Sequence, residues 1–141
     1  ITYDSLTAAN IERIKSLKDI VLVASSSHTN PVGELRALVH KLVAEGVTAP
    51  VVMRRTYNES SVDTLRLKAA ADLGVLLIDG LADGIWLENS VGSATEINSI
   101  SFGILQATRA RISKTEYIAC PGCGRTMYDL QGTLVGSFTS T

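Results

Sequence analysis

The chain has 141 residues and a formal net charge of −1, so its overall charge does not draw it toward nucleic acid or an anionic membrane. Hydrophobic residues make up 45% and charged residues 19%, as in an ordinary globular protein, and no apolar run reaches the roughly 18 residues of a membrane-spanning helix. The N-terminus, ITYDSLTAAN, lacks the basic and apolar regions of a secretory signal, so we expect a cytoplasmic protein that binds neither nucleic acid nor membrane.

Two helices and a strand are predicted in the first part of the chain. The first helix begins after the N-cap Thr7, and a buried strand is expected at residues 20–24, where apolar β-branched residues are contiguous. The second helix begins at the N-cap Asn30, has Pro31 in its first position and ends at Gly46. The apolar positions expected to face the core are Ile11, Ile14, Leu17, Leu35, Leu38, Val39, Leu42 and Val43.

The pattern then repeats. Ser61 is expected to cap a helix that ends at Gly74, and Ser93 with Glu96 forms a capping box for another helix. The core positions of these helices are Val62, Leu65, Ala69, Leu73, Ile97, Ile100, Ile104 and Leu105. Short apolar runs predict strands at residues 51–53, 75–78, 85–87 and 117–119.

This alternation predicts an α/β fold with a parallel sheet of about five strands, flanked by helices on both faces. The sheet is either doubly wound or a segment of a barrel. If residues 75–78 form a strand, the connection at residues 79–84 is too short for a helical crossover. It is either a tight bend or the point where one structural unit passes to another.

Cys120 and Cys123 are the only cysteines, and they share the tetrapeptide CPGC. Since neither has a distant partner, a long-range disulfide is impossible, which favours a reducing compartment. At this spacing two thiolates can hold one metal or cluster, although a zinc or iron–sulfur centre needs further ligands. The alternatives are a dithiol oxidoreductase with Cys120 as nucleophile, a non-catalytic α/β binding domain with a structural zinc shared with a partner chain, and a plain turn.

Three longer blocks carry a more specific pattern: LLIDGLADGIWLE (76–88), SFGILQATRAR (101–111) and KTEYIACPGCGRTMYDLQ (114–131). In this order and spacing they resemble the large, plant-type form of 4-hydroxy-3-methylbut-2-enyl diphosphate synthase. That family contains iron–sulfur oxidoreductases of the methylerythritol phosphate pathway of isoprenoid biosynthesis. The resemblance extends from about Pro50 to Thr133.

The resemblance implies a [4Fe-4S] cluster held by three cysteines and one glutamate, of which Cys120 and Cys123 match the first two cysteines. It also implies that the full-length enzyme opens the cyclic diphosphate of methylerythritol and removes water, with electrons from ferredoxin or flavodoxin. The block that carries the third cysteine and the glutamate does not occur in this chain. We therefore expect the fragment to lack the cluster and to be inactive.

The domain organisation follows from the same resemblance. Residues 1–114 would be the remainder of an inserted α/β domain together with the last strand and helix of a barrel. Residues 115–141 would be the truncated beginning of the iron–sulfur cluster domain. The family occurs in bacterial cytoplasm and in plastids, and apolar surface uncovered by truncation favours a homodimer.

Several other polar residues lie where parallel sheets place ligand sites, and for each we favour a structural role. His28 lies in the loop SSSHTN at the end of the first strand, where an anion could bind, but capping and turn formation explain this loop as well. Arg54 and Arg55 could meet a phosphate, although a surface ion pair is the commoner outcome. His40 lies on the polar side of its helix and is expected in solvent.

The remaining candidates follow the second strand. Asp79 and Asp83 could ligate a cation, but Asp-Gly dipeptides are first of all turn formers. Trp86 is expected in the core or a domain interface rather than as a stacking platform. The basic residues Arg109, Arg111 and Lys114 are expected to interact with the carboxyl-end dipole of the preceding helix.

Overall fold

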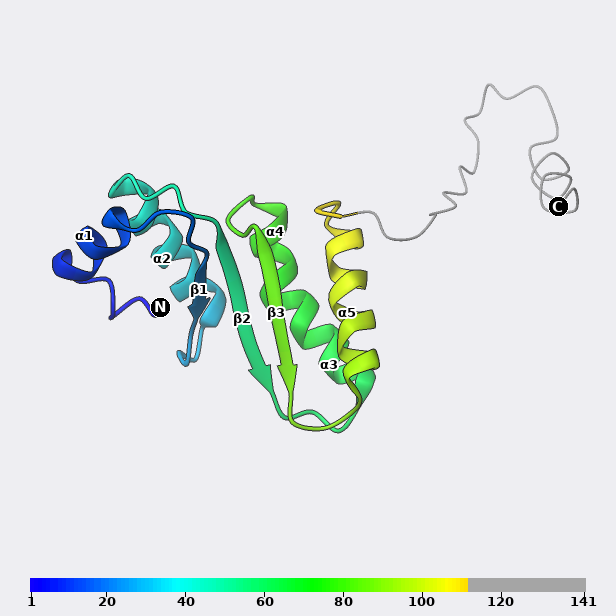
Figure 1. Cartoon of the computed structure of the whole chain (residues 1–141). Coiled ribbons are helices and arrows are strands. Elements are labelled where there is room, and N and C mark those ends of the chain that lie inside the picture. The colour runs from blue at the N-terminus through cyan, green and yellow to red at the C-terminus, as the bar shows by residue number, and fades with distance from the viewer. Residues whose placement is uncertain (112–141) are drawn as a thin grey trace, which may run out of the picture.

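A computed structural model of the chain describes residues 1–111 (Figure 1). The helices and strands alternate as the sequence predicts, and none of the helices within this range is long and apolar enough to cross a membrane. In chain order the elements are α1 (Ala8–Ser16), β1 (Leu22–Ser25), α2 (Pro31–Ala44), β2 (Val51–Tyr57), α3 (Val62–Ala69), the π-helical turn η1 (Ala70–Gly74), α4 (Val75–Ile78), β3 (Gly84–Asn89) and α5 (Ala94–Ala107).

The strands form a parallel sheet in the order β1-β2-β3, so neighbours in the sequence are also neighbours in space. Leu22 pairs with Val51, and Met53 pairs with Ile85. The α/β class and the parallel pairing are thus confirmed. The described part of the chain has three strands rather than five, because residues 75–78 are helical and the strand expected at residues 117–119 lies outside it.

The strand prediction at residues 75–78 is wrong because the helix before it does not end at Gly74. Gly74 has helical dihedral angles, φ −63° and ψ −42°, and the chain leaves the helix only at Asp79 and Gly80, where φ is +69°. The buried positions continue at helical spacing through Leu65, Ala69, Leu73, Leu76 and Leu77. The connection from β2 to β3 is therefore an ordinary helical crossover, and residues 79–83 only bring the chain to the start of β3.

The helix ends mostly follow the sequence signals. Ser93 and Glu96 form the expected capping box, and Asn30 Oδ1 accepts from the Gly33 amide at 3.0 Å. Gly46, at φ +73°, closes α2, while its amide donates to Val43 O at 2.9 Å. Two core predictions are wrong: Leu17 follows the last turn of α1 and is 51% exposed, and Val43 is 65% exposed.

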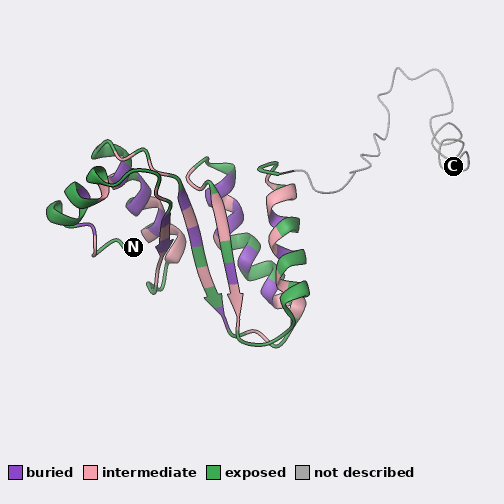
Figure 2. Cartoon of the chain, viewed as in Figure 1, coloured by how far each residue is buried: buried purple, intermediate pink, exposed green. Residues whose placement is uncertain are grey.

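The helices α2, α3, α4 and α5 pack on one face of the sheet, and the other face is open among the described residues (Figures 1 and 2). On β2 the covered face carries Val51, Met53 and Tyr57, which are all buried, while Arg54 and Thr56 on the opposite face are exposed. The turn η1 contacts both α2 and α5, which places these helices in one layer. The expected cover of helices on both faces is therefore not found within residues 1–111.

The short helix α1 lies beyond the β1 edge of the sheet, beside α2 (Figure 1). Its Ile11 joins the core, and Lys15 lies 3.9 Å from the Glu45 carboxylate at the end of α2. The N-terminal residue continues the sheet at this edge, because the Ile1 amino group donates to Val23 O at 2.7 Å and Ser25 N donates to Ile1 O at 3.0 Å.

Candidate functional site

The predicted ligands Cys120 and Cys123 lie outside the described residues, as does Lys114. The cluster, dithiol and zinc interpretations of the two cysteines therefore all stay predictions. Among residues 1–111 no group of three or more His, Cys, Asp or Glu side chains is placed to hold a metal ion. The candidate residues within residues 1–111 are the polar side chains at the edges and on the faces of the sheet.

The loop after β1, residues 26–30, is held by local side-chain hydrogen bonds. The His28 amide donates to Ser26 Oγ at 3.1 Å, and His28 Nδ1 accepts from the Asn30 amide at 3.0 Å. Ser26 Oγ also donates to the carboxylate of Glu34 in the first turn of α2. The turn and capping interpretation of His28 is confirmed, because its ring accepts a backbone hydrogen bond within its own loop.

Arg54 lies on the open face of the sheet and pairs across to β3. Its Nε and Nη2 donate to the two carboxylate oxygens of Glu88 at 3.2 and 2.9 Å, and its guanidinium lies 5.5 Å from the centre of the Trp86 ring. The hydrogen bonds with Arg54, and next that with Thr56, lower the pKa of Glu88, and the same pairing raises the pKa of Arg54. The expected surface ion pair is confirmed, whereas Trp86 is 49% exposed and not in the core of the described residues.

Arg55 lies on the covered face and is bound on two sides. Its Nε donates to the Asp72 carboxylate at 3.2 Å, and its Nη1 donates to Ser26 O at 3.0 Å. Tyr57 donates its hydroxyl to the same Asp72 oxygen at 2.7 Å. Burial, and after it the bond to Asp72, raises the pKa of Tyr57 above its ordinary value of 10.0. Sequence reasoning missed Asp72 and Tyr57.

Asp79 and Asp83 do not form a cation site. Asp79 pairs with Arg36 of α2, whereas Asp83 Oδ2 accepts from the Val51 amide at 2.8 Å at the start of β2. Because residues 75–78 are helical, both carboxylates lie at the amino end of the sheet, opposite to the edge where parallel sheets bind ligands. The turn prediction for this loop is confirmed by Gly80 at φ +69°.

Arg109 and Arg111 follow α5, whose last turn contains no basic side chain. Arg111 lies against the helix, with its guanidinium 5.3 Å from the centre of the Phe102 ring, and the expected interaction with the carboxyl-end dipole stays a prediction. Arg109 follows the helix in a left-handed conformation, with φ 59°. These residues give no sign of an anion site.

The helix N-termini at the carboxyl edge of the sheet are already capped. Asn30, Ser61 and Ser93 each accept a backbone N–H of the helix that follows. The first turns also carry the carboxylates of Glu34, Asp63 and Glu96, which would repel an anion. The Glu96 carboxylate accepts two hydrogen bonds from Ser93, one from its backbone amide and one from its hydroxyl. These bonds lower the pKa of Glu96 and so favour its ionised form. A phosphate would find no open helix N-terminus at this edge of the described sheet.

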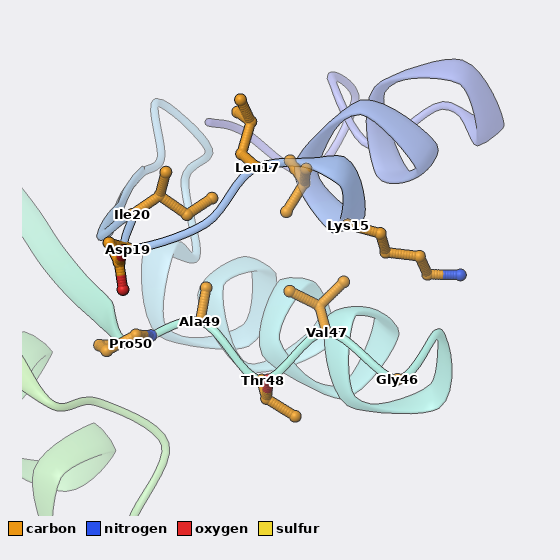
Figure 3. Close-up of a pocket in the computed structure, with 10 residues that line it drawn as sticks. Lys15, Leu17, Asp19, Ile20, Gly46, Val47, Thr48, Ala49 and Pro50 are labelled. Atoms are coloured by element: carbon orange, nitrogen blue, oxygen red, sulfur yellow. The ribbon is translucent and has the colours of Figure 1, made fainter.

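A cavity lies at the opposite, amino end of the sheet (Figure 3). It has a volume of about 380 Å³ and lies between the end of α1 and the loop from α2 to β2. Its lining consists of Ile14, Lys15, Leu17, Asp19, Ile20 and residues 46–50. The two charged side chains are Lys15, which pairs with Glu12 at 3.3 Å, and Asp19.

Comparison with known proteins gives one consistent match. The chain is 51% identical over 134 residues to "4-hydroxy-3-methylbut-2-en-1-yl diphosphate synthase (flavodoxin)" of Parabacteroides distasonis, covering 95% of the chain and 22% of that relative. It is 49% identical over 138 residues to the protein of the same name from Phocaeicola vulgatus, again covering 95% of the chain and 22% of the relative. To "4-hydroxy-3-methylbut-2-en-1-yl diphosphate synthase (ferredoxin), chloroplastic" of Oryza sativa subsp. japonica it is 36% identical over 130 residues, 86% of the chain and 17% of the relative.

No family model and no solved structure matches the chain. The relatives thus carry the enzyme name that the sequence blocks resemble. The two bacterial relatives are more similar to the chain than the plant relative is. The chain spans about a fifth of the length of the curated relatives it matches. Over nearly its whole length, therefore, this chain matches one segment of enzymes named 4-hydroxy-3-methylbut-2-en-1-yl diphosphate synthase.

Proposed function

We propose that the chain is a segment of an iron–sulfur oxidoreductase that converts methylerythritol cyclodiphosphate to hydroxymethylbutenyl diphosphate in isoprenoid biosynthesis. The observation that carries this proposal is the 51% identity to a synthase of that name across 95% of the chain. The isolated chain is inactive in this proposal, because it spans only about a fifth of such a relative.

The donor set of the chain fits half of a cluster site. Cys120 and Cys123 would supply two thiolates to a [4Fe-4S] cluster, and the remaining ligands would come from parts of the parent protein outside this sequence. The cluster would supply electron transfer and a Lewis acid to the bound substrate. Two thiolates without the other ligands hold iron poorly, so the chain by itself is not expected to retain the cluster.

The described residues support a barrel segment rather than a doubly wound sheet. In a doubly wound sheet the helices cover both faces, whereas in a barrel every helix lies on the outer face. Here the strands follow one another in the order β1-β2-β3, and α2 to α5 share one face. In this proposal residues 1–114 are the remainder of an inserted domain with the last strand and helix of a barrel, and residues 115–141 begin the cluster domain.

The finer properties of the parent protein follow from its relatives. We favour flavodoxin as the electron donor and the bacterial cytoplasm as the location, because relatives at 48–51% identity are bacterial proteins with flavodoxin in their names. The plastid protein with ferredoxin in its name is 36% identical. The large, plant-type form remains part of the proposal. A homodimer is proposed only for the isolated chain, in which surface that the rest of the parent protein would cover is exposed.

The test is a chimera in which this chain replaces the matching segment of the Parabacteroides distasonis synthase. The purified chimera should show a visible iron–sulfur absorption band and should convert the cyclic diphosphate when reduced flavodoxin is supplied. Cys120→Ser should remove both the band and the turnover. His40→Ala, at an exposed position on α2, is the matched control and should leave both unchanged.

Each outcome is informative if circular dichroism shows that the chimera is folded. A folded chimera without iron and without turnover refutes the equivalence of the segments. A folded Cys120→Ser chimera with full iron content and activity refutes the assignment of this cysteine. Zinc in place of iron in anaerobically purified protein would support the structural-zinc alternative instead.

A further inference from the structure

We propose that Arg55, held in place by Asp72, is a strut that fixes the loop of residues 26–30 at the carboxyl edge of the sheet. This device concerns the fold of the chain alone and does not depend on the proposed enzymatic activity. It is carried by contacts among three separate segments: β2, the loop after β1, and the π-helical turn η1.

The guanidinium of Arg55 spans the gap between two of these segments. Nη1 donates to Ser26 O at 3.0 Å, while Nε and Nη2 lie 3.2 and 3.1 Å from Asp72 Oδ2. The side chains of Arg55 and Asp72 are only 16% and 21% exposed, so their attraction is less screened by water than that of a surface pair. The planar fork of arginine allows both sets of bonds at once, which the single point charge of lysine does not.

Asp72 lies in the π-helical turn η1, on the side that faces β2. At about 100° per residue, a position seven after Leu65 lies within about 20° of it, at the edge of the buried face. A carboxylate there needs partners, because a partly buried charge without them is unfavourable. Two donors from β2 meet this need, since Asp72 Oδ2 accepts from Arg55 Nε at 3.2 Å and from the Tyr57 hydroxyl at 2.7 Å.

The loop depends on its anchor at Ser26. The Ser26 hydroxyl accepts from the His28 amide and donates to Glu34, and His28 Nδ1 accepts from the Asn30 amide. The side-chain Oδ1 of Asn30 caps α2 by accepting from the Gly33 amide. Each of these bonds lies within the loop or joins it to the start of α2. The Arg55 bond to Ser26 O is the side-chain bond that ties this chain of contacts to β2 and, through Asp72, to η1.

The test is amide hydrogen exchange of the 141-residue chain at His28 and Asn30, normalised to the core amide of Met53. Arg55→Met keeps most of the side-chain volume and removes every donor. It should speed exchange at both loop amides by about tenfold, because hydrogen bonds to charged groups contribute at least that factor. Arg54→Met, at the adjacent position on the open face, removes a bidentate ion pair and should leave the loop amides within about twofold of the parent.

Two milder variants keep the test decisive if Arg55→Met does not fold. Arg55→Lys retains the charge, and Asp72→Asn retains an acceptor for Tyr57, but each should still speed loop exchange. In the Arg55→Lys background, adding Asp72→Asn should have less effect on the loop than Asp72→Asn has alone, because Asp72 acts through Arg55. Native exchange at His28 and Asn30 in folded Arg55→Lys and Asp72→Asn proteins would overturn the proposal, as would equal acceleration by Arg54→Met.

Discussion

Replacing Leu76 by alanine tests the helical assignment of residues 75–78. Leu76 is 0% exposed in α4, and the substitution removes three carbon groups from the core. At about 0.8 kcal/mol for each buried CH₂, the transfer loss is about 2.4 kcal/mol. The cavity left behind raises the expected loss of unfolding free energy to about 3 kcal/mol or more.

The matched control is Ile78→Ala, two residues further along the same short helix. Ile78 is 69% exposed, so its truncation should change the free energy of unfolding by less than about 0.5 kcal/mol. The measurement is urea denaturation of the 141-residue chain and both variants, followed by circular dichroism. The slope of free energy against denaturant should stay the same, since neither change alters the surface exposed on unfolding by much.

A buried strand at the same residues would give a different result. In a parallel strand covered on both faces, Leu76 and Ile78 would point to the same face, and both truncations would be costly. Comparable losses for the two variants would therefore refute the helix and restore the strand that the sequence pattern predicts. A large loss at Leu76 alone can be explained only if the residues are spaced as in a helix.

Three other predictions concern the cap, the buried tyrosine and the open face. Ser93→Ala removes the N-cap of α5 and should cost about 1 kcal/mol in denaturant unfolding, while Ser93→Thr should retain most of it. Because folding raises the pKa of Tyr57, the stability that this group contributes is present below its ordinary pKa of 10.0 and is lost as the pH rises above that value. In urea unfolding at a series of alkaline pH values, Tyr57→Phe should therefore lose less unfolding free energy above pH 10.0 than the parent chain does. Trp86, the single tryptophan, is 49% exposed, so acrylamide should quench its fluorescence in the isolated chain and quench it less in the chimera described above, if further strands close the barrel over it.

The sequence predicted the helix ends correctly wherever a single local interaction, such as an N-cap, determines where the helix begins or ends. The caps at Asn30, Ser61 and Ser93 formed as expected, because each satisfies backbone donors that have no other partner. Gly46 closes α2 because glycine adopts a left-handed conformation without strain. Such signals act within a few residues, so the sequence alone contains what they need.

The strand prediction for VLLI, residues 75–78, is wrong because a short apolar segment is compatible with both a buried strand and a buried helix. The information that decides between them is the spacing of Leu65, Ala69 and Leu73 before it, which continues at helical intervals into Leu76. The sequence pattern predicts a helix end at Gly74, but Gly74 lies inside the helix and packs close to the end of α5, where Thr108 Cγ2 would be 3.7 Å from an added Cβ. Packing between helices therefore determines the role of this glycine, and the neighbouring residues in the sequence do not reveal that packing.

The polar network around Asp72 shows the corresponding limit for sites. Alternation along VVMRRTY places Met53, Arg55 and Tyr57 on one face of β2, so the sequence contains a sign that an arginine and a tyrosine hydroxyl would face the helix layer. Their partner in that layer is Asp72 of η1, which accepts from both side chains. The pairing depends on how the helix layer packs against β2, and local patterns of the sequence do not contain that packing.

The open face of the sheet connects these findings to the proposed parent protein. Strands of parallel sheets are covered on both faces in folded proteins, yet the face that carries Arg54, Thr56 and Trp86 is exposed among the described residues. Arg54 is kept neutralised there by Glu88, so the face presents paired charges and an indole rather than a free cation. This face is not a ready diphosphate site, because the Arg54 guanidinium would have to give up Glu88 before it could bind phosphate. The chemistry of the parent enzyme is therefore expected to depend on the cysteine block and on segments beyond this sheet.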